Sequence, residues 1–498
     1  LTLKGSVKVD AEPSNGTHVF TGGFAGTTAG TGGKTLTFNN VKLGGDTENS
    51  FTVTHIGRLN TNGGDRYDTD NDTTGTGGFI GGLWNINTNM VFNDCSYNNI
   101  SVTGPGIVGG LVGRVWQKSS TIRINRETKL GDNYDFNNSK ITTEIASGGT
   151  KITRKNAYEG VSPYNDIYGI GGLVGYTASA ISIRNVRMNN VFIDASGSSN
   201  LGLDAGGFVG YVNNFLYKRV SVNNCDIVNV GIKGALRSGG VLGTINVLTS
   251  NTIYNGIATG TTTIDKVTVD GLYTLDNGGS DTFPSATGGF VGFVLGRLTV
   301  IDSTVKNSKI ISKRYAGGLA GKLSNCEHAF KIKNVTIDNS IIASVGDKKG
   351  AGGIVGTSNQ GKVPVYGYEI LIKDTAVGYW LNNNGSPTTN TTIDAVKELK
   401  LPTDTDNNIK NTIGLWNGGK YEKYSDVNYQ NNKAYYGSDG NIGVWFGSEN
   451  TSGDIKLIAV QTKNCYLPLR MYGNKANANL ADNDVIIYAN YNVNVTDS

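Results

Sequence analysis

The segment from Gly317 to Ile342 reads GGLAGKLSNCEHAFKIKNVTIDNSII and contains both elements of the repeat that decides the fold. The first element is the pattern Gly-Gly-apolar-apolar-Gly, which begins at Gly317. The second is Ile332–Ile342, where β-branched residues alternate over short runs around Asn and Asp. Such runs are typical of β-strands, so the segment predicts short strands joined by Gly and Asn corners.

This pattern recurs along most of the chain. The glycine element begins at Gly22, Gly77, Gly109, Gly171, Gly206, Gly239, Gly288, Gly317 and Gly352. Five of the eight gaps between copies are 29 to 35 residues long, and we interpret the longer gaps as loop insertions or degenerate copies. The second element recurs at 183–193, 222–232 and 301–311, with looser copies at 92–95 and 264–269. No sustained helical spacing occurs before about residue 390, so the repeat predicts a β-solenoid whose coils stack about 4.8 Å apart.

Glycine and asparagine suit the corners of such coils for different reasons. Glycine accepts positive φ and a close backbone approach, whereas asparagine tolerates the left-handed region and bonds stacked backbone groups. An extended apolar pair inside the glycine element sends one side chain into the core. The destination of the other side chain stays open at this stage.

Composition excludes several classes of protein. The chain has 498 residues, with 71 Gly, 8 Pro, 4 Cys and a net charge of +4. Scarce proline excludes collagen, four cysteines cannot staple a chain of this length, and 37% hydrophobic residues argue against disorder. The sequence shows no dense basic stripe and no apolar run long enough to span a membrane, so we expect no nucleic-acid partner and no membrane span.

The predicted fold class is all-β, a parallel β-helix-like solenoid with a C-terminal β-rich, sandwich-like domain. We expect an N-terminal strand segment at 1–20, the solenoid at 21–360 and the β-rich domain at 361–498. Three of the five Trp lie in that last part, at Trp380, Trp416 and Trp445. The segment Thr392–Leu401 is a candidate short helix.

Both ends of the chain alternate between apolar and polar residues. Apolar positions fall on one face at each end: Leu1, Leu3, Val7 and Val9 at the start, and Val485, Ile487, Tyr491, Val493 and Val495 at the end. A strand with one apolar face requires an apolar groove. Each strand either pairs within its own chain or is donated to a neighbouring subunit, and we predict donation.

The glycine elements between Gly22 and Gly356 resemble the GLUG motif of repeats in bacterial surface and secreted proteins. These include adhesin-like proteins and IgA-specific peptidases. The resemblance implies an extracellular bacterial protein with a β-helical stalk. It carries over no catalytic residue, because the motif has none.

Candidate metal ligands are few. Asp68, Asp70 and Asp72 offer the clustered oxygen ligands that calcium prefers. However, Thr73 stands where an EF-hand loop needs Gly, so we interpret the run as a solvated acidic loop, with calcium as the alternative. His328 follows Cys326 by two residues, but a structural zinc site needs four ligands.

The four cysteines show no disulfide framework. Cys95 and Cys225 occupy similar places in their repeats, several coils apart, and are expected to be buried as small hydrophobes. Cys326 and Cys465 would pair only if the last domain folds back on the solenoid.

The absence of nucleophile-elbow, zinc-protease and phosphate-loop motifs predicts a protein that is not an enzyme and carries no cofactor. We expect a secreted and processed structural protein of a bacterial surface, a homopolymer in a filament, fimbria or sheath. One alternative is a surface adhesin for host or matrix glycans or for a host protein. The other is a β-helical polysaccharide-degrading enzyme, which would need a carboxylate pair in a groove.

Overall fold

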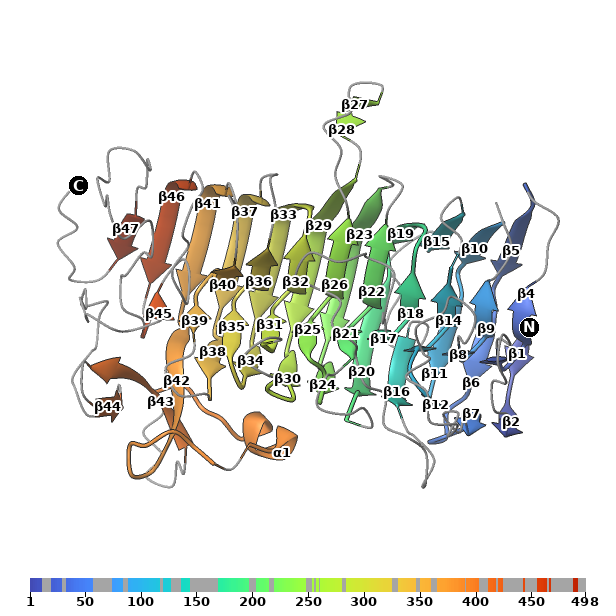
Figure 1. Ribbon diagram of the computed structural model, residues 1–498, viewed down its shortest axis with the longest axis horizontal. Helices are drawn as coiled ribbons and strands as arrows, with labels where there is room; N and C mark the ends of the chain where they lie inside the picture. The colour runs from blue at the N-terminus through green and yellow to red at the C-terminus, as the bar shows by residue number, and fades with distance from the viewer. Residues whose placement is uncertain are drawn as a thin grey trace, which may run out of the picture.

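The computed structural model shows a chain built almost entirely of strands, whose coils stack along the long axis (Figure 1). It describes residues 1–10, 19–28, 33–56, 74–83, 88–116, 120–126, 136–143, 169–196, 203–214, 219–247, 253–254, 257–258, 260–279, 284–324, 330–345, 350–359, 365–389, 391–402, 411–417, 420–423, 442–443, 455–463, 465–466 and 487–490. The predicted all-β class is confirmed.

Three long sheets run the length of this stack. The first comprises β3 (Val19–Gly22), β8 (Thr74–Gly77), β13 (Val108–Gly109), β17 (Gly169–Gly171), β21 (Asp204–Gly206), β25 (Arg237–Gly239), β31 (Ala286–Gly288), β35 (Tyr315–Gly317), β39 (Ala351–Gly352) and β45 (Ile442–Gly443). The second comprises β4 (Ala25–Thr28), β9 (Ile80–Leu83), β14 (Val112–Val115), β18 (Val174–Thr177), β22 (Val209–Asn214), β26 (Leu242–Val247), β32 (Val291–Leu295), β36 (Ala320–Ser324) and β40 (Val355–Asn359).

The third sheet is the largest and bends within each coil. Its first limb comprises β5 (Thr35–Asn39), β10 (Asn89–Asn93), β15 (Thr121–Asn125), β19 (Ala180–Arg184), β23 (Val220–Val228), β29 (Thr261–Asp270), β33 (Arg297–Lys306), β37 (Phe330–Asp338), β41 (Val365–Lys373) and β46 (Ile455–Lys463). Its second limb comprises β1 (Thr2–Leu3), β2 (Gly5–Asp10), β6 (Lys42–Gly44), β7 (Phe51–Ile56), β11 (Ser96–Asn98), β12 (Ile100–Gly104), β16 (Phe136–Thr143), β20 (Arg187–Asp194), β24 (Gly231–Lys233), β30 (Tyr273–Leu275), β34 (Lys309–Ser312), β38 (Ile341–Ser344) and β42 (Ala376–Asn382).

Equivalent positions of successive coils pair in parallel, which is the ladder that the repeat predicts. In the first sheet Gly206 pairs with Gly239, which in turn pairs with Gly288. Inward-facing residues of all three sheets merge into one continuous hydrophobic core. Each coil therefore buries its apolar face against its neighbours, as a solenoid-like fold requires.

The glycine element marks the tight turn between the first and second sheets. A Cβ on Gly206 would lie 2.0 Å from the carbonyl oxygen of Val209, and one on Gly207 would lie 2.0 Å from that of Gly240 in the next coil. Only glycine permits this backbone approach. Phe208 and Val209, the apolar pair of this copy, are both fully buried, which answers the question that the sequence left open.

Two columns of left-handed residues form the bends of the third sheet. The first column holds Asn40, Asp94, Asn185, Asn224, Lys266, Asp302, Asn334 and Glu369, and the second holds Asn99, Asn138, Asn190, Asn229, Gly271, Asn307, Asn339 and Asp374. Their φ angles are positive at every position. Asparagine and aspartate dominate because they adopt this conformation at the least cost after glycine. The predicted Asn corners are therefore confirmed.

A small polar residue follows many of these corners, and its side chain forms the hydrogen bonds that the backbone groups at the bend do not form with one another. The Ser340 hydroxyl donates to the carbonyl oxygen of Asp338 (2.6 Å) and accepts from the N–H of Ser308 one coil away (3.1 Å). A bend would otherwise leave these buried backbone groups without a partner. Ser308 repeats the arrangement, donating to Lys306 (2.7 Å) and accepting from Leu272 (3.2 Å).

The predicted domain boundary at residue 361 is wrong for the described strands. Strand β41 pairs in parallel with β37, β42 pairs with β38, and β46 pairs with β41. In the first sheet Gly443 pairs with Gly352, so this ladder also continues past the boundary. The solenoid-like coil thus extends where a separate sandwich-like domain was expected.

Within the described residues, two insertions depart from the coil. The hairpin β27 (Ile253–Tyr254) and β28 (Ile257–Ala258) projects between β26 and β29 (Figure 1). A longer insertion between β42 and β45 contains α1 (Ile393–Lys397), β43 (Asn411–Asn417) and β44 (Lys420–Lys423), the two strands pairing antiparallel. The short helix predicted within Thr392–Leu401 is confirmed.

Candidate functional surfaces

The N-terminal strands belong to the coil of their own chain. Thr2 pairs in parallel with Lys42, and Val7 pairs with Val53. Leu3, Val7 and Val9 are half-buried while their polar neighbours are exposed, so the predicted apolar face is confirmed. In the structure this strand pairs within its own chain, which is the alternative that the sequence left open beside the predicted donation.

The first complete coil ends in open strand edges. Within the described residues, β2, β3, β4 and β5 each pair along one edge only. Phe24 stacks on Phe79 (ring centroids 4.8 Å, interplanar angle 12°), yet 54% of Phe24 is exposed. Phe79 holds the same motif position one coil further on and is 1% exposed. Phe24 is therefore a core residue whose outer side has no covering coil among the described strands.

The C-terminal assembly strand is described only in part. Strand β47 (Ile487–Asn490) extends the third sheet by pairing in parallel with β46, with Ile487 opposite Val460. Val485, Tyr491, Val493 and Val495 lie outside the described residues. Of the apolar residues predicted for the N-terminal strand, Leu1 is 62% exposed.

The insertion carrying α1 packs as an arm against the third sheet. Thr392 caps the helix, its hydroxyl accepting from the N–H of Ala395 (3.2 Å), and Val396 is fully buried. Lys309 from β34 donates to the carbonyl oxygen of Lys397, and burial lowers the pKa of Lys309. The Lys397 ammonium lies 4.8 Å from the ring centroid of Tyr273, a cation–π contact.

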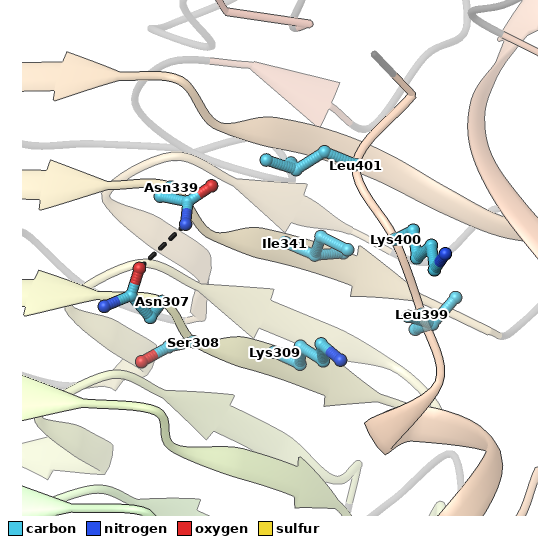
Figure 2. Close-up of a pocket in the computed structure, with 8 residues that line it drawn as sticks. All are labelled: Asn307, Ser308, Lys309, Asn339, Ile341, Leu399, Lys400 and Leu401. Atoms are coloured by element: carbon cyan, nitrogen blue, oxygen red, sulfur yellow. Dashed lines mark hydrogen bonds between the residues drawn. The ribbon is translucent and has the colours of Figure 1, made fainter. Parts of the chain in front are cut away.

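A recess of about 340 Å³ lies between this arm and the coil corners (Figure 2). Its lining residues are Asn307, Ser308, Lys309, Asn339, Ile341, Leu399, Lys400 and Leu401. They supply amides, a hydroxyl and ammonium groups on an apolar floor, but no carboxylate. The recess therefore lacks the carboxylate pair of a glycosidase, and its geometry is that of a joint between arm and coil.

A buried carboxyl and a buried ion pair serve the coil itself. Asp276 accepts from the Thr287 and Ser312 hydroxyls and from the backbone N–H groups of Gly278 and Lys313. Burial raises the pKa of this carboxyl, and those hydrogen bonds oppose the rise.

The second group is a buried ion pair between neighbouring coils. Asp204 lies 3.7 Å from Arg237, and the two side chains are 1% and 3% exposed. The Arg237 guanidinium also lies 4.0 Å from the ring centroid of Phe293. No solvent reaches these groups, so we assign them to stability and not to chemistry on a substrate.

The described cysteines are structural. Cys95, Cys225 and Cys465 are buried thiols. Cys95 and Cys225 each follow a corner residue and donate to the carbonyl two residues back, so their predicted equivalence is confirmed. Cys326 lies outside the described residues, and so does the pairing with Cys465 that we considered.

The metal candidates named from the sequence are not among the described residues. Asp68, Asp70 and Asp72 lie outside the described residues, as do Cys326 and His328. Within the part of the chain that the structure describes, no group of three or more His, Cys, Asp or Glu is placed to hold a metal ion. In that same part, no helix is long and apolar enough to cross a membrane.

Sequence reasoning missed an exposed aromatic pair. Tyr366 and Tyr368 on β41 are 39% and 45% exposed, although most large apolar and aromatic side chains of the described coils are buried. The sequence held a signal for this pair, since two tyrosines two residues apart in a strand share a face.

Comparison of the chain with protein-family models, curated proteins and solved structures gives no match.

Proposed function

We propose that the chain is a secreted structural protein of a bacterial surface whose copies stack end to end into a filament. The observation that carries this proposal is the uncovered first coil, with its open edges and the exposed ring of Phe24. The GLUG-like repeat supports the extracellular location. No catalytic role and no cofactor enter the proposal.

The parallel pairing of the strands favours a second copy of the chain as the partner that covers the first coil. A parallel ladder has two different ends, and at the far end the described strands β40, β45 and β47 each pair along one edge only, the edge type that the first coil of another copy accepts. A head-to-tail contact of this kind does not close on itself and generates an open filament. Assembly thus requires no donated strand, and we replace donation with end-on stacking.

The coil is suited to bear load along its axis. Corner amides bond from coil to coil, as in Asn190 to Asn138 (2.9 Å) and Asn224 to Asn185 (2.7 Å). Glycine turns bring backbones into close contact at each level. Such a stack deforms only if many equivalent bonds yield together.

Sedimentation velocity over a range of protein concentrations tests the proposal. The intact chain is expected to form species that grow with concentration, whereas Phe24→Lys sediments as a monomer because a charge is placed on the stacking surface. Tyr366→Lys is the matched control, an exposed aromatic on the side of the coil and not on its stacking surface, and is expected to assemble normally. A wild-type chain that stays monomeric, or Phe24→Lys assembling equally well, overturns the proposal.

A further inference from the structure

The outer face of β37 and β41 carries a flat grid of two tyrosines and two lysines. Lys331 pairs in register with Tyr366, and Lys333 pairs with Tyr368. The residues between them, Ile332 and Gly367 among others, are buried, so all four grid residues point to the outer face. Neighbouring strands lie about 4.8 Å apart and alternate residues about 7 Å apart, which sets the scale of the grid.

The two lysines of this grid have no acidic partner among the described residues. Other lysines on the third sheet pair with an acid one coil away, as Lys373 does with Asp338 (2.9 Å) and Lys306 with Asp270 (3.2 Å). Lys331 and Lys333 make no ion pair within the described residues, and both are exposed. The grid therefore offers positive charge and aromatic faces together.

We infer that this grid binds an anionic polysaccharide. Tyrosine rings present an apolar face to the C–H face of a sugar ring, and their hydroxyls bond to water or to sugar hydroxyls. Lysine ammonium groups, as mobile point charges, match the carboxylate or sulfate groups of the polymer. Small molecules bind in concave sites, whereas an open, flat face suits an extended chain with repeated contacts.

The same two columns on earlier coils lack this combination. Along the first column the positions aligned with Tyr366 are Thr299, Thr263, Ser221, Ser182 and Arg123. Along the second, Ile301, Asp265, Asn223 and Arg184 align with Tyr368. Arg123 and Arg184 are exposed cations without an aromatic neighbour in their columns, which makes them a control within the same sheet.

The inference does not depend on filament formation, because the grid lies on the side of the coil and not at its end. The test measures binding of the full chain to immobilised polygalacturonate, dextran sulfate and neutral dextran, at low and high salt. Binding to either anionic polymer, about tenfold weaker at high salt and undetectable on dextran, is expected. Equal binding to dextran overturns the inference.

Variants locate the site. Lys331→Gln with Lys333→Gln, and separately Tyr366→Ala with Tyr368→Ala, are each expected to weaken binding about tenfold or more. Tyr366→Phe with Tyr368→Phe keeps the rings and is expected to retain most of the affinity, which separates stacking from a folding defect. Arg123→Gln with Arg184→Gln removes the same charge and is expected to change affinity less than about twofold. Equal losses in the two charge variants, or equally tight binding of single-stranded DNA, overturn the inference.

Discussion

The side-chain amide of Asn339 donates to the side-chain carbonyl of Asn307 one coil away, over 2.7 Å, and both residues hold a positive φ (Figure 2). Asn307 in turn donates to Asp270 (2.7 Å). Asn339 and Asn307 thus each serve two purposes, since they accept the left-handed bend and extend a column of bonds along the solenoid axis. We expect the two contributions to be separable by mutation.

Asn339→Ala is expected to lower the free energy of unfolding by about 1–2 kcal/mol, because alanine resists the left-handed conformation. Asn339→Gly removes the same amide but accepts the bend, so its loss is expected to be about half as large. Denaturant titration followed by far-ultraviolet circular dichroism compares the two. Equal losses would show that Asn339 contributes no conformational advantage.

Gly207→Ala is expected to destabilise the coil by about 3 kcal/mol or more, since its Cβ would meet the carbonyl oxygen of Gly240 at 2.0 Å. The backbone of the next coil cannot move without breaking its own ladder. Gly45→Ala is the matched control, because there a Cβ would meet the mobile end of Lys4 at 3.1 Å and the Ser50 hydroxyl at an ordinary 3.7 Å. Thermal unfolding that leaves Gly207→Ala as stable as Gly45→Ala would contradict the packing described for the glycine turn.

The sequence predicted the repeating corners well because Asn, Asp and Gly are chosen there for local backbone reasons. It did not predict that Lys266 and Glu369 share the left-handed column, because neither residue type favours that conformation locally and the position follows only from alignment with the neighbouring coils. The C-terminal coil was missed because a long insertion separates Gly443 from Gly352, its partner in the first sheet. The regular spacing between glycine elements, on which the prediction relied, is therefore lost there.

The surfaces were harder to predict than the coil. Alternation in Leu1–Val9 defines an apolar face but is the same for a strand paired in its own chain and one donated to another. The recess in Figure 2 depends on contact between Lys309 and Lys397, which lie far apart in sequence. Such contacts follow from the docking of an insertion, for which a local pattern carries no signal.

The buried carboxyl of Asp276 is expected to make stability depend on pH. Its pKa is raised by burial above the unfolded value of 3.8, so the folded state holds the proton more tightly than the unfolded state. The stabilisation is therefore fully present below about pH 3.8 and is lost as pH rises through the raised pKa. The Asp276→Asn side chain cannot lose a proton. The free energy of unfolding of this variant, relative to that of the wild type, is therefore expected to rise between pH 4 and pH 7. Unfolding titrations that show the wild type gaining on the variant as pH rises would contradict this account.

Buried thiols are expected to report on the integrity of the coil. Burial raises the pKa of Cys465 to about 12 and raises the pKa of Cys95 as well, so burial disfavours the reactive thiolate form of both residues. In a Cys326→Ser background, iodoacetamide at pH 8 is expected to modify no cysteine of the native chain and all three in denaturant, as read by mass spectrometry. Rapid native labelling of Cys465 would show that the coil at β46 is open.

Negative-stain electron microscopy of the purified chain at physiological salt tests the stacking proposal most directly, with Phe24→Lys imaged beside it. We predict unbranched filaments from the wild type, one coil stack in width, and isolated short rods from the variant. Isolated rods or closed pairs from the wild type, or filaments from both proteins, would contradict end-on stacking through the first coil.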